Sequence, residues 1–157
     1  MTAVLFENIS ELRTVSALGT LANAAIVADD GRIAWIGPTA QAPAADTRIN
    51  LGGRAVLPGW VDSHTHMLFD GNRAAEFEAR MAGQSYAAGG INVTVTATRA
   101  ATDTRLEQLL HDRINAARAG GTTTLETKTG YGLDVESERR AARIAATGVD
   151  DVTFLGA

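Results

Sequence analysis

Residues 56–66, with the sequence VLPGWVDSHTH, constrain this chain more than any other segment. An apolar run leads into His64 and His66, which stand two positions apart. Because successive side chains of a strand point to opposite faces, a strand through this segment would direct both imidazoles to the same side. Imidazole nitrogens are strong ligands for zinc and related metals. The segment therefore predicts a strand that ends in one half of a metal site.

The composition indicates a globular chain and argues against nucleic acid or a membrane as partner. Of its 157 residues, 45% are apolar and 20% are charged, and the formal net charge is −4. No cluster of basic residues is available to neutralise phosphates. No apolar segment approaches the length of a signal-peptide core or a membrane span, so we expect a cytoplasmic protein. Since the chain has no cysteine, its strong metal ligands are His, Asp and Glu.

Residues 1–55 are predicted to form short strands. Two apolar runs, NAAIVA and RIAWIG, flank the sequence DDG at positions 29–31, which is typical of a β-hairpin turn. Residues 38–47 hold two of the three prolines and indicate a surface connection. The sequence thus predicts a β-rich domain over residues 1–55 and a second domain over residues 56–157.

The second domain is expected to continue from the histidines into a long loop with short helices, up to about residue 102. Thr104 and Glu107 then have the spacing of a capping box, which predicts the start of a helix that Gly120 and Gly121 end. Apolar residues recur through this helix at helical spacing. They are Leu106, Leu110, Ile114 and Ala117. His111 lies among charged residues in the same helix, so we expect it to be exposed.

A second predicted helix is flanked by strands. Residues 122–127, TTTLET, are rich in β-branched side chains and predict a strand. Asp134 is the expected N-cap of the following helix, and Gly148 its end. Residues 151–157 predict a further strand. Strands that alternate with helices indicate βαβ units in a parallel sheet.

Several motifs together resemble the amidohydrolase superfamily. The strings GRIAWIG and AVLPGWVDSHTH are similar to its N-terminal signature, and GTTTLETKTGYGLD and TFLGA narrow the resemblance to the imidazolonepropionase family. The resemblance implies an α/β fold class. Residues 1–55 would be the N-terminal part of a small β-sandwich, and residues 56–157 the first strands and helices of a TIM-type (β/α)₈ barrel. Since such a barrel needs roughly 250 residues, we expect it to be truncated here.

The resemblance also implies roles for individual residues. His64 and His66 would bind a single Zn or Fe ion. The residues implied in substrate binding are Arg73, Tyr131 and Tyr86. The planar fork of an arginine matches a carboxylate, and the substrate of the family, 4-imidazolone-5-propanoate, carries one. The remaining metal ligands and the general base are expected beyond Ala157, so no catalytic residue is expected within this chain.

Structural explanations of the same side chains stay open. Arg73 could instead form a surface ion pair with Asp70 or Glu76. Tyr131 could be an aromatic side chain that packs its own loop.

Glu126 and Lys128 alternate on a predicted strand and therefore share a face. We expect them to form an ion pair inside the mouth of the barrel. The alternative is a carbamylated lysine that bridges two metal ions.

The function implied by the resemblance is hydrolysis of the cyclic amide of 4-imidazolone-5-propanoate to N-formimino-L-glutamate by metal-activated water, in histidine breakdown. A deaminase or a dihydropyrimidinase-like enzyme on the same scaffold is the first alternative, and a non-catalytic metal-binding module is the second. The expected partner is a small molecule with a carboxylate, with a homodimer for the full-length protein. Because two ligands do not hold a catalytic ion, we expect the 157 residues alone to be inactive.

Overall fold

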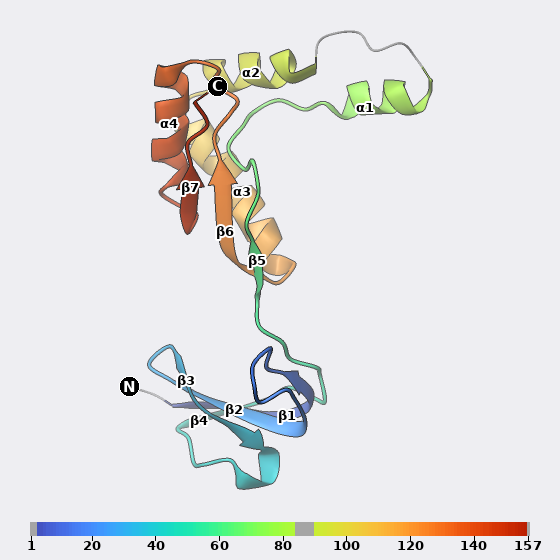
Figure 1. Cartoon of the computed structure of the whole chain (residues 1–157), viewed down its shortest axis with the longest axis vertical. Coiled ribbons are helices and arrows are strands. Elements are labelled where there is room, and N and C mark those ends of the chain that lie inside the picture. The colour runs from blue at the N-terminus through green and yellow to red at the C-terminus, as the bar shows by residue number, and fades with distance from the viewer. Residues whose placement is uncertain (1–2, 84–89, 157) are drawn as a thin grey trace. The chain divides into compact units, whose positions relative to one another are not determined.

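The computed structural model describes residues 3–83 and 90–156 and divides into two compact units (Figure 1). The units are Met1–Pro58 and Gly59–Ala157. Each unit has its own sheet and its own apolar core. None of the helices in the described ranges is long and apolar enough to cross a lipid bilayer.

The first unit is a four-stranded sheet in the order β3-β2-β1-β4. Its elements are β1 (Val4–Arg13), β2 (Thr20–Asp29), β3 (Arg32–Pro38), the short 3-10 helix η1 (Thr39–Gln41) and β4 (Thr47–Asn50). The hairpin predicted between β2 and β3 is confirmed. Asp30 and Gly31 connect the two strands with φ of 50° and 70°, the left-handed backbone that a tight two-residue hairpin turn requires.

The sheet of the first unit buries apolar side chains on both faces. Leu5 pairs with Val27 in one apolar cluster, and Ile9 pairs with Ala24 in another. Between these pairs the register of β1 shifts at Asn8, which has a φ of 59°. An extra residue in one strand reverses which face the following side chains occupy, so the bulge lets β1 serve both clusters. The described residues of the first unit form one mixed sheet, and a two-layered sandwich stays a prediction.

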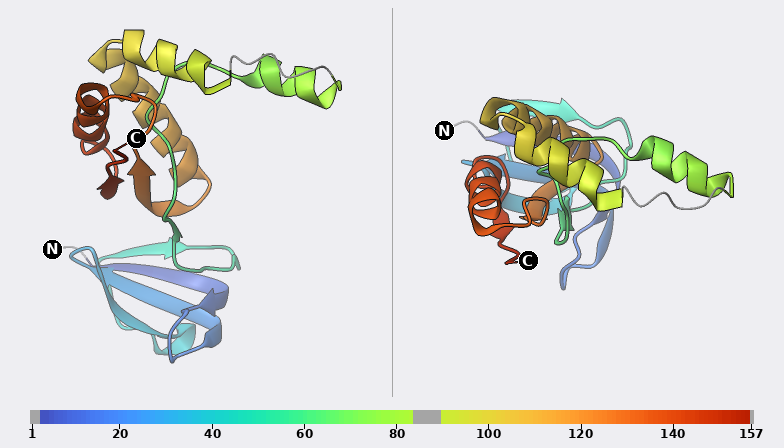
Figure 2. Two further views of the ribbon diagram at one scale, coloured as in Figure 1. Left: turned by 45° about the horizontal axis from the view of Figure 1, so that its top comes forward. Right: turned by 90° about the horizontal axis from the view of Figure 1, so that it is seen from above.

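The second unit contains a parallel three-stranded sheet in the order β5-β6-β7, with helices between the strands. Figures 1 and 2 show α3 and α4 beside this sheet. The predicted parallel βαβ arrangement and the α/β class are confirmed, whereas a closed barrel stays a prediction. The elements are β5 (Trp60–Asp62), α1 (Ala74–Met81), α2 (Gly90–Ala100), α3 (Asp103–Ala119), β6 (Thr122–Lys128), α4 (Val135–Ala145) and β7 (Asp151–Thr153).

The core of the second unit lies between β6 and the two helices α3 and α4. Leu125 of β6 is buried against both helices. The helical residues of this cluster recur every three or four positions, which places them on one face of each helix. They are Leu106, Leu110 and Ile114 of α3 and Ala141 and Ile144 of α4. The predicted apolar face of α3 is therefore confirmed.

Helix α3 begins earlier than predicted. Its N-cap is Thr102 rather than Thr104, because Thr102 has extended backbone and its Oγ1 accepts the N–H of Arg105 at 3.2 Å. Both threonines suit a cap chemically, and the backbone that leads into the helix selects the first. The predicted end at Gly120 is confirmed.

The expected N-cap of α4 is also confirmed, since Asp134 Oδ1 accepts the N–H of Ser137 at 2.8 Å. The predicted end at Gly148 is wrong. The helix ends at Ala145, and Gly148 lies in a turn in which its N–H donates to the carbonyl of Ala145.

Strand β7 is shorter than the predicted strand over residues 151–157. Beyond Thr153, the N–H of Leu155 donates to the side chain of Thr129 at 3.0 Å. Because this donor bonds a loop side chain instead of a neighbouring strand, the chain leaves the sheet there.

Candidate metal and substrate site

His64 and His66 lie in the loop after β5. The prediction of a strand through residue 66 is wrong, because β5 ends at Asp62. The loop nevertheless continues beside β6, since the N–H of Lys128 donates to the carbonyl of Thr65 at 2.8 Å. The histidines therefore flank Thr65, which is hydrogen-bonded to the carboxyl end of β6.

The two imidazoles lie side by side, as predicted. Their ring centroids are 5.7 Å apart, with 65° between the ring planes. Two imidazoles bound to one tetrahedral ion, with metal–nitrogen bonds of about 2 Å, have centroids about 5 Å apart. The separation of the rings is thus close to the one that a shared ion would require. His64 is exposed, whereas His66 is half-buried.

One nitrogen of His66 is buried without a partner. Its Nδ1 atom has no hydrogen bond among the described residues. A buried polar atom without a partner costs free energy, and such atoms are rare in native proteins. A bound ligand would relieve this cost. Within residues 3–83 and 90–156, however, no group of three or more His, Cys, Asp or Glu side chains could hold an ion, so the pair is an incomplete ligand set.

Arg113 of α3 holds the backbone that follows the histidines. Its Nη1 donates to the carbonyls of Met67 and Phe69, each at 2.7 Å. On the β6 side, the N–H of Met67 donates to Thr127 Oγ1 at 2.8 Å. Burial lowers the pKa of Arg113, but the guanidinium remains charged at neutral pH. The loop is therefore held from two elements at once.

Tyr131 connects the histidines to a cavity. Its ring lies 5.8 Å from that of His66 in a T-shaped contact and 5.3 Å from that of Phe69. Tyr131 also lines a cavity of about 400 Å³. Other residues that line it are Phe69, Asn72, Arg73, Phe77 and Thr94. The ring is thus a packed loop aromatic and a cavity wall at the same time.

Arg73 lies at the rim of this cavity and immediately precedes α1. The alternative ion pair with Asp70 is wrong, because Asp70 pairs with Arg105 at 3.2 Å. That hydrogen bond from Arg105 lowers the pKa of Asp70. Arg73 has no partner among the described side chains, and the side chain of Glu76 is not one of them. Tyr86 lies outside the described residues.

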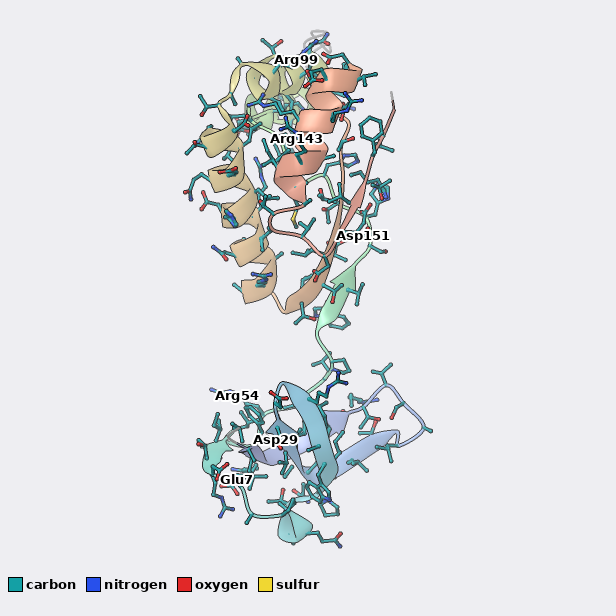
Figure 3. All side chains as sticks on the ribbon, turned by 90° about the vertical axis from the view of Figure 1, so that its left-hand side faces the viewer. Glu7, Asp29, Arg54, Arg99, Arg143 and Asp151 are labelled. Carbon is teal, nitrogen blue, oxygen red and sulfur yellow. The ribbon has the colours of Figure 1, made fainter. Side chains whose placement is uncertain are left out.

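The expected ion pair between Glu126 and Lys128 is confirmed. Lys128 Nζ lies 2.6 Å from Glu126 Oε1, and the two side chains are 18% and 11% exposed, respectively. Burial acts to raise the pKa of Glu126, but hydrogen bonds, first of all from Lys128, outweigh it and leave the pKa lowered. The pair lines a second cavity of about 340 Å³, together with Asp62 and Asp151. Figure 3 labels Asp151, which stands at the start of β7.

Two further residues of this region were not predicted, Arg113 and the buried Glu138. Glu138 stands three positions before Ala141 on the buried face of α4, and Arg113 stands three positions after Leu110 in α3. A charged residue in line with an apolar stripe is the signal that could have found both. His111 of α3 is exposed, as predicted.

Comparison with known sequences finds close relatives, although no protein-family model matches the chain. An imidazolonepropionase of Micrococcus luteus is 63% identical over 163 residues, which cover 100% of this chain and 41% of that protein. An imidazolonepropionase of Saccharopolyspora erythraea is 61% identical over 158 residues, with coverages of 100% and 41%.

Solved structures of hydrolases share the fold at much lower identity. Molinate hydrolase superposes with a TM-score of 0.59 at 21% identity, over 99% of this chain and 30% of that one. An amidohydrolase superposes with a TM-score of 0.60 at 16% identity, over 98% and 32%. Zinc-complexed atrazine chlorohydrolase TrzN from Arthrobacter aurescens TC1 gives 0.57 at 17% identity, over 96% and 35%. The chain thus belongs by sequence to the imidazolonepropionase family, and it spans about two fifths of the length of the curated relatives that it matches.

Proposed function

We propose that this chain contributes half of the metal site and part of the substrate site of an imidazolonepropionase, which hydrolyses 4-imidazolone-5-propanoate. The observation that carries the proposal is a continuous line of contacts. It runs from the two adjacent imidazoles through the ring of Tyr131 to the cavity that holds Arg73. Tyr131 would therefore lie between the metal and the cavity that binds the carboxylate of the substrate.

The ion would be held by His64 and His66. The separation of their rings and the unpartnered Nδ1 of His66 support this assignment. Nitrogen ligands suit both zinc and iron, and the zinc in the structure of TrzN supports zinc. When bound, a divalent ion at such a site supplies a water that is reactive near neutral pH.

Arg73 would bind the propanoate group of the substrate. Its guanidinium is exposed at the cavity rim and has no partner among the described side chains, so it is available to a ligand. Two parallel N–H donors of an arginine match the two oxygens of a carboxylate. Tyr131 would bound the substrate ring on the side nearer the metal, since its own ring contacts His66. Tyr86 stays a predicted substrate contact.

The decisive experiment is a chimera in which these 157 residues replace the aligned residues of the Micrococcus luteus imidazolonepropionase. We expect the chimera to hydrolyse 4-imidazolone-5-propanoate with kcat/KM within about tenfold of the parent enzyme, and His66→Ala in the chimera to abolish turnover. A folded, metal-loaded chimera that instead opens uncharged rings such as dihydrouracil would favour the dihydropyrimidinase-like alternative and reject the proposal.

The metal assignment can be measured on the chain itself. Isothermal titration with Zn²⁺ should show binding that His64→Ala and His66→Ala each weaken at least tenfold, because each variant removes one of two nitrogen donors. His111→Ala is the matched control, since His111 is exposed on α3. Equal affinities in all three variants would contradict the assignment.

A further inference from the structure

A buried carboxylate beside the site has no role in the function proposed above. Glu138, in the first turns of α4, is only 1% exposed. Its Oε2 accepts the N–H of Gly130 at 2.6 Å, and its Oε1 accepts those of Gly132 and Leu133 at 2.7 and 2.9 Å. No cationic side chain of the described chain pairs with it. The negative charge is therefore compensated by the backbone of one loop and by the amino end of the helix.

The loop that Glu138 binds has a backbone that needs external support. Leu133 has a φ of 57°, a left-handed conformation that is unfavourable for a residue with a branched side chain, and Gly130 has a φ of 130°. At Gly132 the loop lies directly on α4, because a Cβ there would come within 2.7 Å of the Cβ of Ser137. Three hydrogen bonds to one buried side chain can hold such a conformation.

Tyr131 lies at the centre of this arrangement. The amides of Gly130 and Gly132, on either side of it in the sequence, both bind the carboxylate of Glu138. The phenol ring that emerges between them contacts His66 and lines the cavity of Arg73. The position of the ring relative to both groups therefore depends on the hydrogen bonds of Glu138.

We propose that Glu138 is a positioning residue that fixes Tyr131 between the metal-binding histidines and the carboxylate-binding cavity. All its described hydrogen bonds from the loop come from backbone amides, so it acts on substrate recognition through Tyr131. The role in recognition rests on the function proposed above. We call the three hydrogen bonds from the amides of Gly130, Gly132 and Leu133 to Glu138 the clamp. The clamp is a property of the chain and is measurable without activity.

The clamp is tested by NMR on the 157-residue chain with Glu138→Gln. The variant keeps the shape of the side chain but replaces one acceptor oxygen with an NH₂ donor, which cannot accept a backbone N–H. We expect the amide protons of Gly130, Gly132 and Leu133 to move upfield and the nuclear Overhauser contact between the rings of Tyr131 and His66 to weaken.

Glu136→Gln is the matched control for the NMR experiment. Glu136 lies in the same turn of α4, but its side chain is 77% exposed. We expect this variant to leave the loop amides and the ring contact unchanged. An unchanged Tyr131–His66 contact in folded Glu138→Gln would overturn the proposal.

The effect on recognition is measured in the chimera. Glu138→Gln should raise KM for 4-imidazolone-5-propanoate about tenfold and leave kcat within about threefold, because a displaced Tyr131 impairs binding more than the reaction. Unchanged KM, or a loss confined to kcat, would contradict the positioning role. An inactive chimera without the substitution would reject the proposed function but leave the NMR result on the clamp standing.

A second variant covers the case in which Glu138→Gln does not fold. Gly132→Ala keeps the carboxylate but pushes the loop off α4, because the added Cβ would meet Ser137 and the backbone N of Glu138. We expect it to displace the Tyr131 ring and to raise KM in the same way. Gly156→Ala is its control, since a Cβ at that position would make only an ordinary contact, 3.6 Å from Phe154. Equal KM values and an equally unchanged position of the Tyr131 ring in the two glycine variants would overturn the proposal.

Discussion

The guanidinium carbon of Arg113 lies 3.7 Å from the centre of the Phe69 ring. The same side chain donates to the carbonyls of Phe69 and Met67, so one arginine stacks on the loop and bonds its backbone. A cation over an aromatic face is attracted by the ring, and the attraction grows when both groups are removed from water. The segment that carries the histidines is therefore tied to helix α3.

Replacing this arginine should loosen the metal-binding loop. Arg113→Met keeps the aliphatic stem but leaves two carbonyls without their donor, so we expect a loss of about 2 kcal/mol in the free energy of unfolding. We also expect weaker Zn²⁺ binding, because the histidines precede the released segment. Urea unfolding and isothermal titration measure the two effects. Arg118→Met, at an exposed position of the same helix, should cost less than about 0.5 kcal/mol; equal losses would count against the role of Arg113.

Arg73→Lys should separate carboxylate recognition from catalysis. In the chimera we expect KM for 4-imidazolone-5-propanoate to rise about tenfold with little change in kcat, because a lysine cannot present the two-pronged donor pair. Steady-state kinetics measure the effect. Arg118→Lys serves as the control. If Arg73→Lys left KM unchanged, the carboxylate would have to bind elsewhere.

The ion pair of Glu126 should make stability depend on pH. Burial opposes ionisation of Glu126, but hydrogen bonds from Lys128, Thr153 and Thr65 outweigh it, so its pKa is lower in the folded chain than its ordinary value. A carboxyl with a lowered pKa stabilises the fold above its unfolded pKa of about 4.3, and the contribution is lost as the pH falls through the lowered value. The difference in unfolding free energy between wild type and Glu126→Gln should therefore be largest near neutral pH, at about 2 kcal/mol, and should shrink below about pH 4.

Urea unfolding between about pH 7 and pH 2.5 measures this difference. Glu136→Gln is the control, because its carboxylate is exposed, and it should change stability by less than about 0.5 kcal/mol. A constant difference between wild type and Glu126→Gln across the range would show that the charge of Glu126 does not stabilise the fold.

The N-cap of α3 can be assigned by two alanine substitutions. Thr102→Ala should cost about 1 kcal/mol, because it removes the side-chain acceptor of the N–H of Arg105. Thr104→Ala lies inside the helix and should cost less than about 0.5 kcal/mol, since alanine has the higher helix propensity. Thermal or chemical unfolding compares the two. A larger loss of stability in Thr104→Ala than in Thr102→Ala would instead support Thr104 as the N-cap, as predicted from the sequence.

Features that depend on neighbours in the sequence were predictable. The apolar face of α3, the cap at Asp134, the hairpin turn at Asp30 and the pairing of Glu126 with Lys128 all follow from spacings of a few residues. Such patterns reflect the geometry of a single helix, strand or turn. The adjacent imidazoles of His64 and His66 also follow from spacing, although the predicted strand is absent.

Only the tertiary structure decided which distant groups meet. Asp70 pairs with Arg105, 35 residues away, instead of with the nearby Arg73, which leaves Arg73 at the cavity rim. Arg113 reaches a carbonyl 46 residues before it. These contacts depend on how α3 packs against β6 and the loop. A local sequence pattern spans only a few residues and therefore cannot predict contacts between segments so far apart in the chain. The sequence by itself determined the elements and the chemistry of the candidate ligands, whereas packing between remote segments decided which side chains support them, because burial and hydrogen bonding are satisfied over the whole fold.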